Sequence, residues 1–521
     1  MSTAILDSPI EENVQPRLHG DSLAASVLLV LAMTVIQRLL GFGRGILVCR
    51  WLNAEQLGTW DVTFGFLQLA APLAVLGLPG SFGRYVEYYR QRGHLRTFLT
   101  RTAILSAAMA LIVSLTIASA RESFSWLIFG RTDEAALVGW IAVSLIVFIC
   151  HNFLTSLFIA VRCYRVVSAL QFFQSLLFAL FSISLLLAWK LDAESIVLAF
   201  GLSCLLCCLG AWSRMRALWS VDREELATVP QRSFWTKLMP FAMWIWMTNL
   251  LANLFEVCDR YLIVHYSGLA PSEALQVVGN YHSSRIIPVL FVGIAGMIGA
   301  MITPHLSCDW EKGNRRAVID RLNMVTKTTA LLQFAASVMV LMGAPLLFEV
   351  AFKNKLSGGM EVLPWTLVYC SLFSLFAIAQ NYLWCAEKAG LSSLSLLLGL
   401  AVGICINLVL LPIFGLHGAV WASTCANVVA LGTMYFFSQL LGMQFDRGTW
   451  IATFAPMSVG LGVWPAFAVL LIVLIVTVAT CQVYTAGEKQ RLCEMMVGFL
   501  TKVRQQVHRR VGPTCADAMV P

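Results

Sequence analysis

The stretch NLFEVCDRYLIVHY, residues 253–266, lies in an apolar run that begins near Phe241, yet it carries Glu256, Asp259 and Arg260. Such a run is typical of a helix that crosses a bilayer, because a hydrocarbon core about 30 Å thick requires roughly 20 mainly apolar residues. A charged side chain near the bilayer centre costs at least about 2.5–3.5 kcal/mol. The stretch therefore predicts a membrane-spanning helix whose charged face lies against protein or water.

The rest of the 521-residue chain has the same character. Hydrophobic residues make up 59% of it and charged residues 12%, and the mean hydropathy is +0.77. This composition excludes a soluble domain and predicts an all-α polytopic membrane protein. The cysteines lie in apolar segments without the spacing of metal ligands, so we expect core residues and no metal site. The first 21 residues lack the basic start of a cleaved signal peptide.

Apolar runs and their breakers predict twelve spans before an ambiguous last segment. They lie near residues 22–49, 59–82, 98–118, 136–161, 168–189, 194–212, 238–266, 275–303, 328–350, 363–385, 391–413 and 416–441. Basic residues flank segment 450–484 on both sides, which requires an even number of crossings, and GLGVWP at 460–465 supplies the turn of a hairpin. We therefore expect about fourteen transmembrane helices. Most Lys and Arg fall in alternate loops, which places both termini in the cytoplasm.

An internal repeat organises these spans. RGHLRTFLTR at 92–101 matches KGNRRAVIDR at 312–321 at a constant offset, and RGILV followed by LGTW at 44–60 parallels RYLIV followed by VGNY at 260–281. A parallel duplication of six spans explains both matches and predicts two pseudo-symmetric lobes. The expected divisions are a cytoplasmic segment 1–21, an N-lobe 22–237, a C-lobe 238–441, a helical hairpin 442–487 and a basic cytoplasmic tail 488–521.

The leading spans of the two lobes carry the polar residues. In span seven, Asn249, Asn253, Glu256 and Arg260 fall on one helical face. Polar residues also occur in three other spans: Gln37, Arg38 and Arg44 in span one, Asp61 in span two, and Tyr281, His282 and Arg285 in span eight. We expect these faces to meet in one cavity between the lobes. Alternatively, Glu256 and Arg260 neutralise each other one turn apart, and Asp259 pairs with an arginine of a neighbouring helix.

The sign of the intramembrane charge points to an anionic ligand. Arg38, Arg44, Arg260 and Arg285 give the predicted cavity a basic bias that suits phosphate, for which the guanidinium group is well matched. The loops are too short for a catalytic domain, and no P-loop, GxSxG or HExxH motif occurs. We therefore expect a transporter and no enzyme, with no catalytic residues, no cofactor and no nucleic-acid partner.

The stretch NLVLLPIFGLHGAVWAST, residues 407–424, resembles the hallmark of the polysaccharide and O-antigen (Wzx-type) flippases in the multidrug/oligosaccharidyl-lipid/polysaccharide (MOP) exporter superfamily. The matching positions are Asn407, Pro412, Gly415, Gly418 and Ala419. The LGTW and DRYLIV stretches are similar to that family too, and the likeness covers roughly residues 24–485. Gly415 and Gly418 themselves require only a packing role.

The resemblance implies a two-lobed transporter of the cytoplasmic membrane. It would move a polyprenyl-diphosphate-linked oligosaccharide to the outer leaflet by alternating access, for lipopolysaccharide or other surface polysaccharide, with a polymerase and glycosyltransferases as partners. The diphosphate would contact Arg38, Arg44, Arg260 and Arg285, with Gln37, Asn249 and Asn253 beside them, while the lipid tail stays in the bilayer near spans one and eight. A sodium or proton gradient would drive transport through Asp61, Glu256 or Asp259. A drug or cation antiporter and a lipid II flippase of the same superfamily are the alternatives, and a nontransporting scaffold would leave the polar stripe unexplained.

Overall fold

A computed structural model describes residues 23–220, 230–490 and 494, and the side chains of residues 23–32 and 217–220 are not part of that description. The described chain is helical and contains no strand. The expected cytoplasmic segment 1–21 lies outside the described residues. The expected tail 488–521 also lies outside them, except for residues 488–490 and 494. The first half holds α1 (Leu23–Trp51), α2 (Ala54–Ala74), the 3₁₀ turn η1 (Pro79–Ser81), α3 (Phe82–Arg90), α4 (Leu95–Ser119), α5 (Arg121–Phe129), α6 (Ala135–Ala160), α7 (Tyr164–Ala188) and α8 (Ala193–Ser220).

The second half begins at α9 (Gln231–Tyr266), so the boundary expected between residues 237 and 238 falls inside a helix. It continues with α10 (Pro271–Arg285), α11 (Pro288–Glu311), α12 (Arg315–Leu346), the π-turn η2 (Leu347–Ala351), α13 (Ser357–Cys385), α14 (Ala389–Phe414), α15 (Leu416–Leu440), α16 (Arg447–Phe454), the 3₁₀ segment η3 (Ala455–Leu461) and α17 (Val463–Ala479). Ten described helices are long and apolar enough to cross a membrane, or eleven if α2 and α3 form one bent span. They correspond to predicted spans two to twelve.

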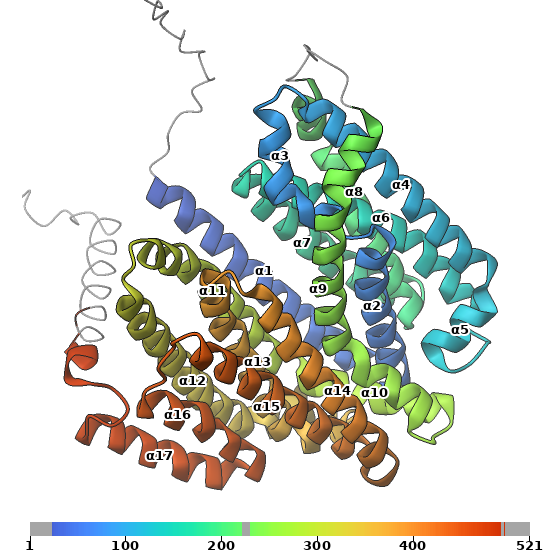
Figure 1. Cartoon of the computed structure of the whole chain (residues 1–521). Helices are drawn as coiled ribbons and strands as arrows, with labels where there is room; N and C mark the ends of the chain where they lie inside the picture. Colours follow the sequence, from blue (N-terminus) through green and yellow to red (C-terminus); the bar gives the residue numbers. More distant parts are fainter. Residues whose placement is uncertain (1–22, 221–229, 491–493, 495–521) are drawn as a thin grey trace, which may run out of the picture.

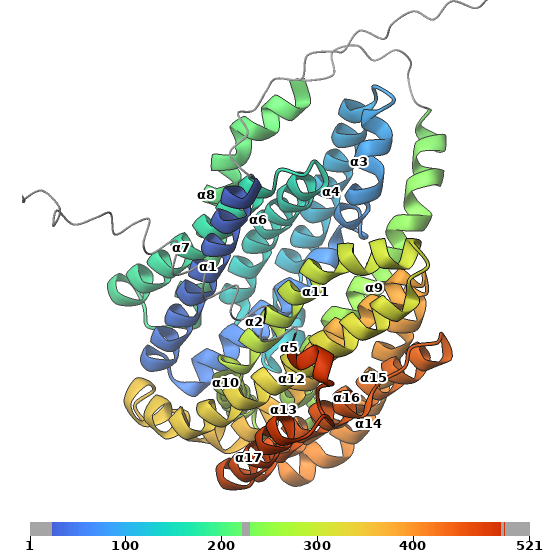
Figure 2. The same ribbon diagram turned by 90° about the vertical axis from the view of Figure 1, so that its left-hand side faces the viewer.

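The helices form two bundles that meet along α2, α9 and α10. In the first, α6 packs against α4 and α8, while α7 packs against α1 and α8; in the second, α13 packs against α10, α11, α12 and α15, and α14 against α15 and α9. Figure 1 shows α3–α8 at the upper right and α11–α17 at the lower left, with the long α9 running from one to the other. Figure 2 shows α1 beside α7 in the first bundle. This architecture confirms the all-α, two-lobed prediction.

Two predicted spans are broken. The chain bends by 65° between α2 and the η1–α3 segment, because Leu76 and Gly77 adopt left-handed backbone angles and Pro79 follows them. The expectation of one continuous helix over 275–303 was wrong, because helix α10 ends at Arg285 and α11 starts at Pro288, which has no amide hydrogen to donate. The second break leaves Arg285 at the end of a helix that faces the other lobe.

The repeat is visible in the backbone at the turns that precede α4 and α12. Gly93 and Gly313 have φ of +69° and +73°. The following residue donates its amide hydrogen back across the turn in both copies, from His94 to the carbonyl of Tyr89 and from Asn314 to that of Asp309. A left-handed backbone conformation costs glycine little free energy, because glycine has no Cβ. The matched glycines therefore specify the same helix-ending turn in both copies of the repeat.

The chain after α15 doubles back on itself. Gly462 has φ of +103° and separates η3 from α17, and a Cβ added at Gly448 would overlap the carbonyl oxygen of Val483, so the two ends of the segment lie side by side. A fully buried lysine joins the same ends to α12, because Lys327 Nζ lies 2.7 Å from Asp446 and 2.9 Å from Glu488. The ninth predicted span begins at residue 328, which left Lys327 in the preceding loop, whereas this residue lies within α12.

Candidate substrate and ion site

One polar cluster joins the two lobes around Asp61. Arg260 Nε of α9 donates to Asp61 Oδ2 of α2 at 2.6 Å, and His282 Nδ1 of α10 lies 2.7 Å from Asp61 Oδ1. The side chains of Asp61 and Arg260 are 4% and 7% exposed. The three residues come from the spans whose polar faces were expected to meet, and the ion pair excludes the alternative in which Arg260 pairs with Glu256 within α9.

A second cluster surrounds Asp259, which faces the interior of the C-lobe. Its Oδ1 accepts a hydrogen bond from Asn407 Nδ2 of α14 at 3.1 Å. Its Oδ2 accepts one from Tyr281 of α10 at 3.3 Å and another from Ser423 of α15. The Tyr281 hydroxyl also lies 2.9 Å from that of Tyr369 in α13. Asp259 is therefore held by neutral donors, and the arginine partner considered in the sequence analysis is not among them.

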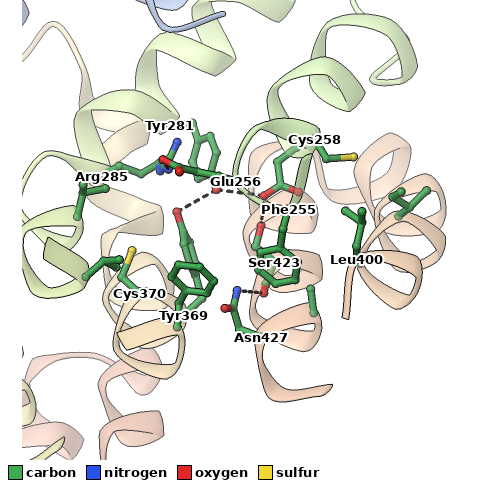
Figure 3. A pocket seen from close by; sticks show the side chains of 17 residues that line it. Phe255, Glu256, Cys258, Tyr281, Arg285, Tyr369, Cys370, Leu400, Ser423 and Asn427 are labelled. Carbon is green, nitrogen blue, oxygen red and sulfur yellow. Dashed lines mark hydrogen bonds and ion pairs between the residues drawn. The ribbon is translucent and has the colours of Figure 1, made fainter. Parts of the chain in front are cut away.

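A pocket of about 90 Å³ opens between these helices. Figure 3 shows Arg285 and Tyr369 on one side of it and Ser423 and Asn427 on the other. Arg285 Nη2 lies 3.7 Å from Glu256 Oε1, at side-chain exposures of 10% and 46%, and Arg285 Nε is buried without a hydrogen-bond partner among the described residues. The guanidinium group thus retains an unused donor beside a half-exposed carboxylate.

The residues of α1 lie apart from this pocket. Arg38 is exposed, and a Cβ added at Gly293 of α11 would lie 3.2 Å from its Cζ, so it stands where α1 faces the C-lobe. Arg44 stacks on the Phe178 ring of α7, with its Cζ 3.7 Å from the ring centre. The backbone carbonyl of Gln37 accepts a hydrogen bond from Ser175 at 3.3 Å.

Asn249 and Asn253 line a separate cavity of about 350 Å³, formed by α2, η1, α6 and α9. Asn253 Nδ2 donates to the Asn249 carbonyl at 2.8 Å. The predicted site residues therefore divide among four places: the Asp61–Arg260 cluster, the pocket of Figure 3, this cavity and helix α1.

Three polar residues that line the pocket were absent from the sequence-based site. Tyr369, Ser423 and Asn427 contribute polar atoms to it, and the Oδ1 atoms of Asn427 and Asn407 are buried without a partner among the described residues. Asn407 and Ser423 both fall in the stretch NLVLLPIFGLHGAVWAST, in which a packing role had been assigned to Gly415 and Gly418. Asn407 and Ser423 are polar residues in two adjacent apolar spans, and this pattern could have indicated that they belong to the site.

Comparison with known families identifies the chain. Residues 23–308, more than half of it, match the model of the polysaccharide biosynthesis protein family. The chain belongs to this family. It is also 22% identical over 221 residues to an uncharacterised membrane protein of Methanocaldococcus jannaschii, a match that covers 40% of this chain and 43% of that protein. The chain thus spans less than half the length of this curated relative.

Solved structures of the MOP superfamily share the fold. The lipid II flippase MurJ in an inward closed conformation superposes with a TM-score of 0.68 at 11% identity, covering 86% of this chain and 98% of that one. An inward-facing multidrug resistance transporter of the MATE family gives 0.63 at 14% identity, covering 80% and 97%. A MOP transporter of Pyrococcus furiosus, described as having a binding pocket of reverse polarity, gives 0.55 at 14% identity, covering 80% and 94%. This member of the polysaccharide biosynthesis family is therefore a multi-pass membrane protein with the fold of the MOP transporters.

Proposed function

We propose that this protein is a flippase that moves a polyprenyl-diphosphate-linked oligosaccharide from the inner to the outer leaflet of the cytoplasmic membrane by alternating access. Both termini lie in the cytoplasm, and a polymerase and glycosyltransferases of surface polysaccharide synthesis act beside it. The family membership of residues 23–308 supports a role in polysaccharide biosynthesis. The two-lobed fold supports transport, because lobes that meet along a few helices can rock about that contact.

The position of Arg285 is the main observation that favours a substrate with an anionic head group. Its guanidinium group lines the pocket with a buried Nε that has no partner among the described residues, and Glu256 engages only Nη2 at 3.7 Å. A diphosphate oxygen would supply the missing acceptor in a charge-assisted hydrogen bond. Arg38, exposed on α1 opposite α11, supplies a second positive charge on the route between the lobes.

The other predicted residues take supporting places in this proposal. The Arg260 side chain forms an ion pair with Asp61. Arg260 therefore joins α9 to α2 and does not contact the diphosphate. Arg44 stacks on Phe178 and contributes positive potential to the N-lobe. Asn249, Asn253 and Gln37 offer neutral donors and acceptors to sugar hydroxyls.

A drug or cation antiporter fits these positions less well. Such a protein would present unpaired carboxylates to its substrate, whereas Asp61 pairs with Arg260 and Glu256 pairs with Arg285. A lipid II flippase would use the same diphosphate chemistry and differ only in the glycan.

Flipping by purified protein in liposomes tests the proposal. A fluorescent polyprenyl-diphosphate oligosaccharide is added to one leaflet, and its arrival in the other is followed with a membrane-impermeant quencher. We expect Arg285→Gln to slow translocation by about tenfold or more, the equivalent of one lost hydrogen bond to a charged group. Lys388→Gln, which removes an exposed charge ahead of α14, serves as the matched control.

Two results would overturn the proposal. One is equal translocation by Arg285→Gln and wild-type protein; the other is translocation of a cationic dye that the lipid-linked oligosaccharide does not inhibit. Comparing oligosaccharides that differ in the sugar, lipid II included, separates the two flippase alternatives.

Asp259 is the residue of this site best placed to couple transport to an ion. A sodium ion prefers oxygen ligands, as hard cations do. The Asp259 carboxylate contacts the Ser423 hydroxyl and the Asn407 amide, and Asn427 lines the same pocket. We propose that sodium binds here and that Glu256 and Asp61, which pair with arginines, do not couple. A proton gradient is the alternative driving force.

A further inference from the structure

A groove runs along the N-lobe between α7 and α8, on a face that the proposed transport route does not use. It has a volume of about 530 Å³ and is lined by Arg165, Val166, Ala169, Leu170, Phe173 and Leu177 of α7 and by Leu206, Cys207, Gly210, Ala211 and Arg214 of α8. The Cys207 thiol lies 3.7 Å from the carbonyl oxygen of Leu170 and joins the two helices at the base of the groove.

The groove is apolar along its length and is not filled by other parts of the described chain. Phe173 and Leu206 are 52% and 42% exposed, and a Cβ added at Gly210 would have no atom within 4 Å. Ala169 and Gly210 leave this groove open because they are small, and larger side chains at these two positions would fill it. In a membrane, such a surface is covered by hydrocarbon.

Positive charge is concentrated at one end of the groove. Arg165 lies in the first turn of α7 and Arg214 near the end of α8, and both side chains are exposed. Positive-inside reasoning places this end at the cytoplasmic surface. From Arg165 to Leu177 the groove follows α7 for roughly 18 Å at about 1.5 Å per residue. This length is close to one leaflet, half of a hydrocarbon core about 30 Å thick.

We propose that this groove binds one anionic glycerophospholipid of the inner leaflet. The headgroup phosphate lies between Arg165 and Arg214, and an acyl chain follows the groove past Gly210 towards Leu177. Arginines on two neighbouring helices suit a phosphate, since two guanidinium groups donate from two directions, and basic pockets between helices at the cytoplasmic surface are typical sites for anionic lipids. A zwitterionic lipid brings a cationic group to the same place, so the site discriminates by charge.

Native mass spectrometry of the full-length protein in neutral detergent tests this site. The protein is titrated with phosphatidylglycerol or with phosphatidylcholine of the same acyl chains. We expect one phosphatidylglycerol to be retained in preference to phosphatidylcholine, and Arg165→Gln/Arg214→Gln to weaken its binding by about tenfold or more. Gly210→Leu, which fills the groove and leaves both charges, is expected to weaken the binding of both lipids.

A charge-matched control separates a site from general attraction. Arg162→Gln/Arg216→Gln removes two exposed arginines, one in the turn between α6 and α7 and one near the end of α8, without changing the groove lining. This variant should bind phosphatidylglycerol as the wild type does. Equal loss in the two double variants, or no preference for the anionic lipid, would overturn the proposal. Tighter retention of a polyprenyl phosphate than of phosphatidylglycerol would also overturn it and assign the groove to the lipid of the transported substrate. Because binding is measured without transport, failure here leaves the flippase proposal standing.

Discussion

Gly58 and Gly279 face one another where α2 crosses α10. A Cβ added at Gly58 would overlap the carbonyl oxygen of Leu275, and one added at Gly279 would overlap that of Ala54. The two glycines occupy the same place in the matching stretches LGTW and VGNY. The repeat therefore contributes one glycine from each lobe to a crossing that leaves no room for a side chain.

Substituting either glycine should separate the lobes at this crossing. Overpacking a tight contact costs about 1–3 kcal/mol, so Gly279→Ala shifts the protein towards conformations in which α2 and α10 lie apart. Spin labels at the exposed residues Thr132 and Leu269 report the change as a longer distance in double electron–electron resonance. Gly296→Ala, in a helix where an added Cβ meets no atom within 4 Å, should leave the distance unchanged. An unaltered distance in Gly279→Ala would show that the crossing does not govern this conformation.

Asp61 neutralises the buried charge of Arg260, so its loss should be costly. Removing one partner of a buried ion pair costs about 3–5 kcal/mol, because the other charge remains without compensation. We expect Asp61→Asn to lower the unfolding midpoint in detergent strongly, and Asp61→Asn/Arg260→Gln to recover part of the loss. Glu256→Gln is the comparison, since its half-exposed pair with Arg285 contributes less than about 1 kcal/mol. Equal midpoints for Asp61→Asn and Glu256→Gln would contradict this assignment.

Sequence patterns predicted the architecture because apolar length, basic loops and matched glycines are local signals. The matched stretches RGHLR and KGNRR form two turns with the same hydrogen bonds, at Gly93 and Gly313. The polar face of α9 likewise predicted contact with protein or water, and its Arg260 pairs with Asp61 of the other lobe.

The interaction partners of these side chains could not be predicted. Helical periodicity gives the direction in which a side chain points, but it does not give the residue of a neighbouring helix that the side chain meets. Glu256 and Arg260 are one turn apart, yet each pairs with a residue of a different helix. Nothing in the sequence around Tyr369 distinguished it from an ordinary core position. Lys327 was misplaced because a lysine near a span end resembles a loop residue, and its two acidic partners lie more than a hundred residues away.

The Lys327 cluster should make stability depend on pH in the acidic range. Burial raises the pKa of Asp446, but hydrogen bonds from Lys327 and Thr449 outweigh it and hold that pKa below its ordinary value of 3.8. A lowered pKa in the folded state means that the carboxylate stabilises the fold above pH 3.8 and that this contribution is lost as pH falls through the folded value.

Asp446→Asn isolates this charge, because asparagine also caps a helix well and keeps the hydrogen bond to the start of α16. The variant should unfold at a lower temperature than the wild type at pH 7, with a difference that narrows as the pH falls below 3.8. Thermal unfolding in detergent at several pH values measures it. Asp320→Asn, at an exposed position of α12, should match the wild type throughout. A difference between Asp446→Asn and the wild type that is constant with pH would exclude a role for the charge.

Asp259 should determine the response to sodium. An ion that binds only the folded state raises the unfolding temperature with concentration, so sodium should stabilise the wild-type protein relative to the same concentration of a large organic cation. Asp259→Asn removes the negative charge of the carboxylate that Ser423 and Asn407 contact, and it should abolish this stabilisation. Glu256→Gln removes a carboxylate from the same pocket without changing those contacts, and it should retain it. Sodium-dependent stabilisation that persists in Asp259→Asn and disappears in Glu256→Gln would move the coupling site to the Arg285 side of the pocket. A wild-type protein indifferent to sodium, with flipping that follows an imposed pH gradient, would instead favour protons as the coupling ion.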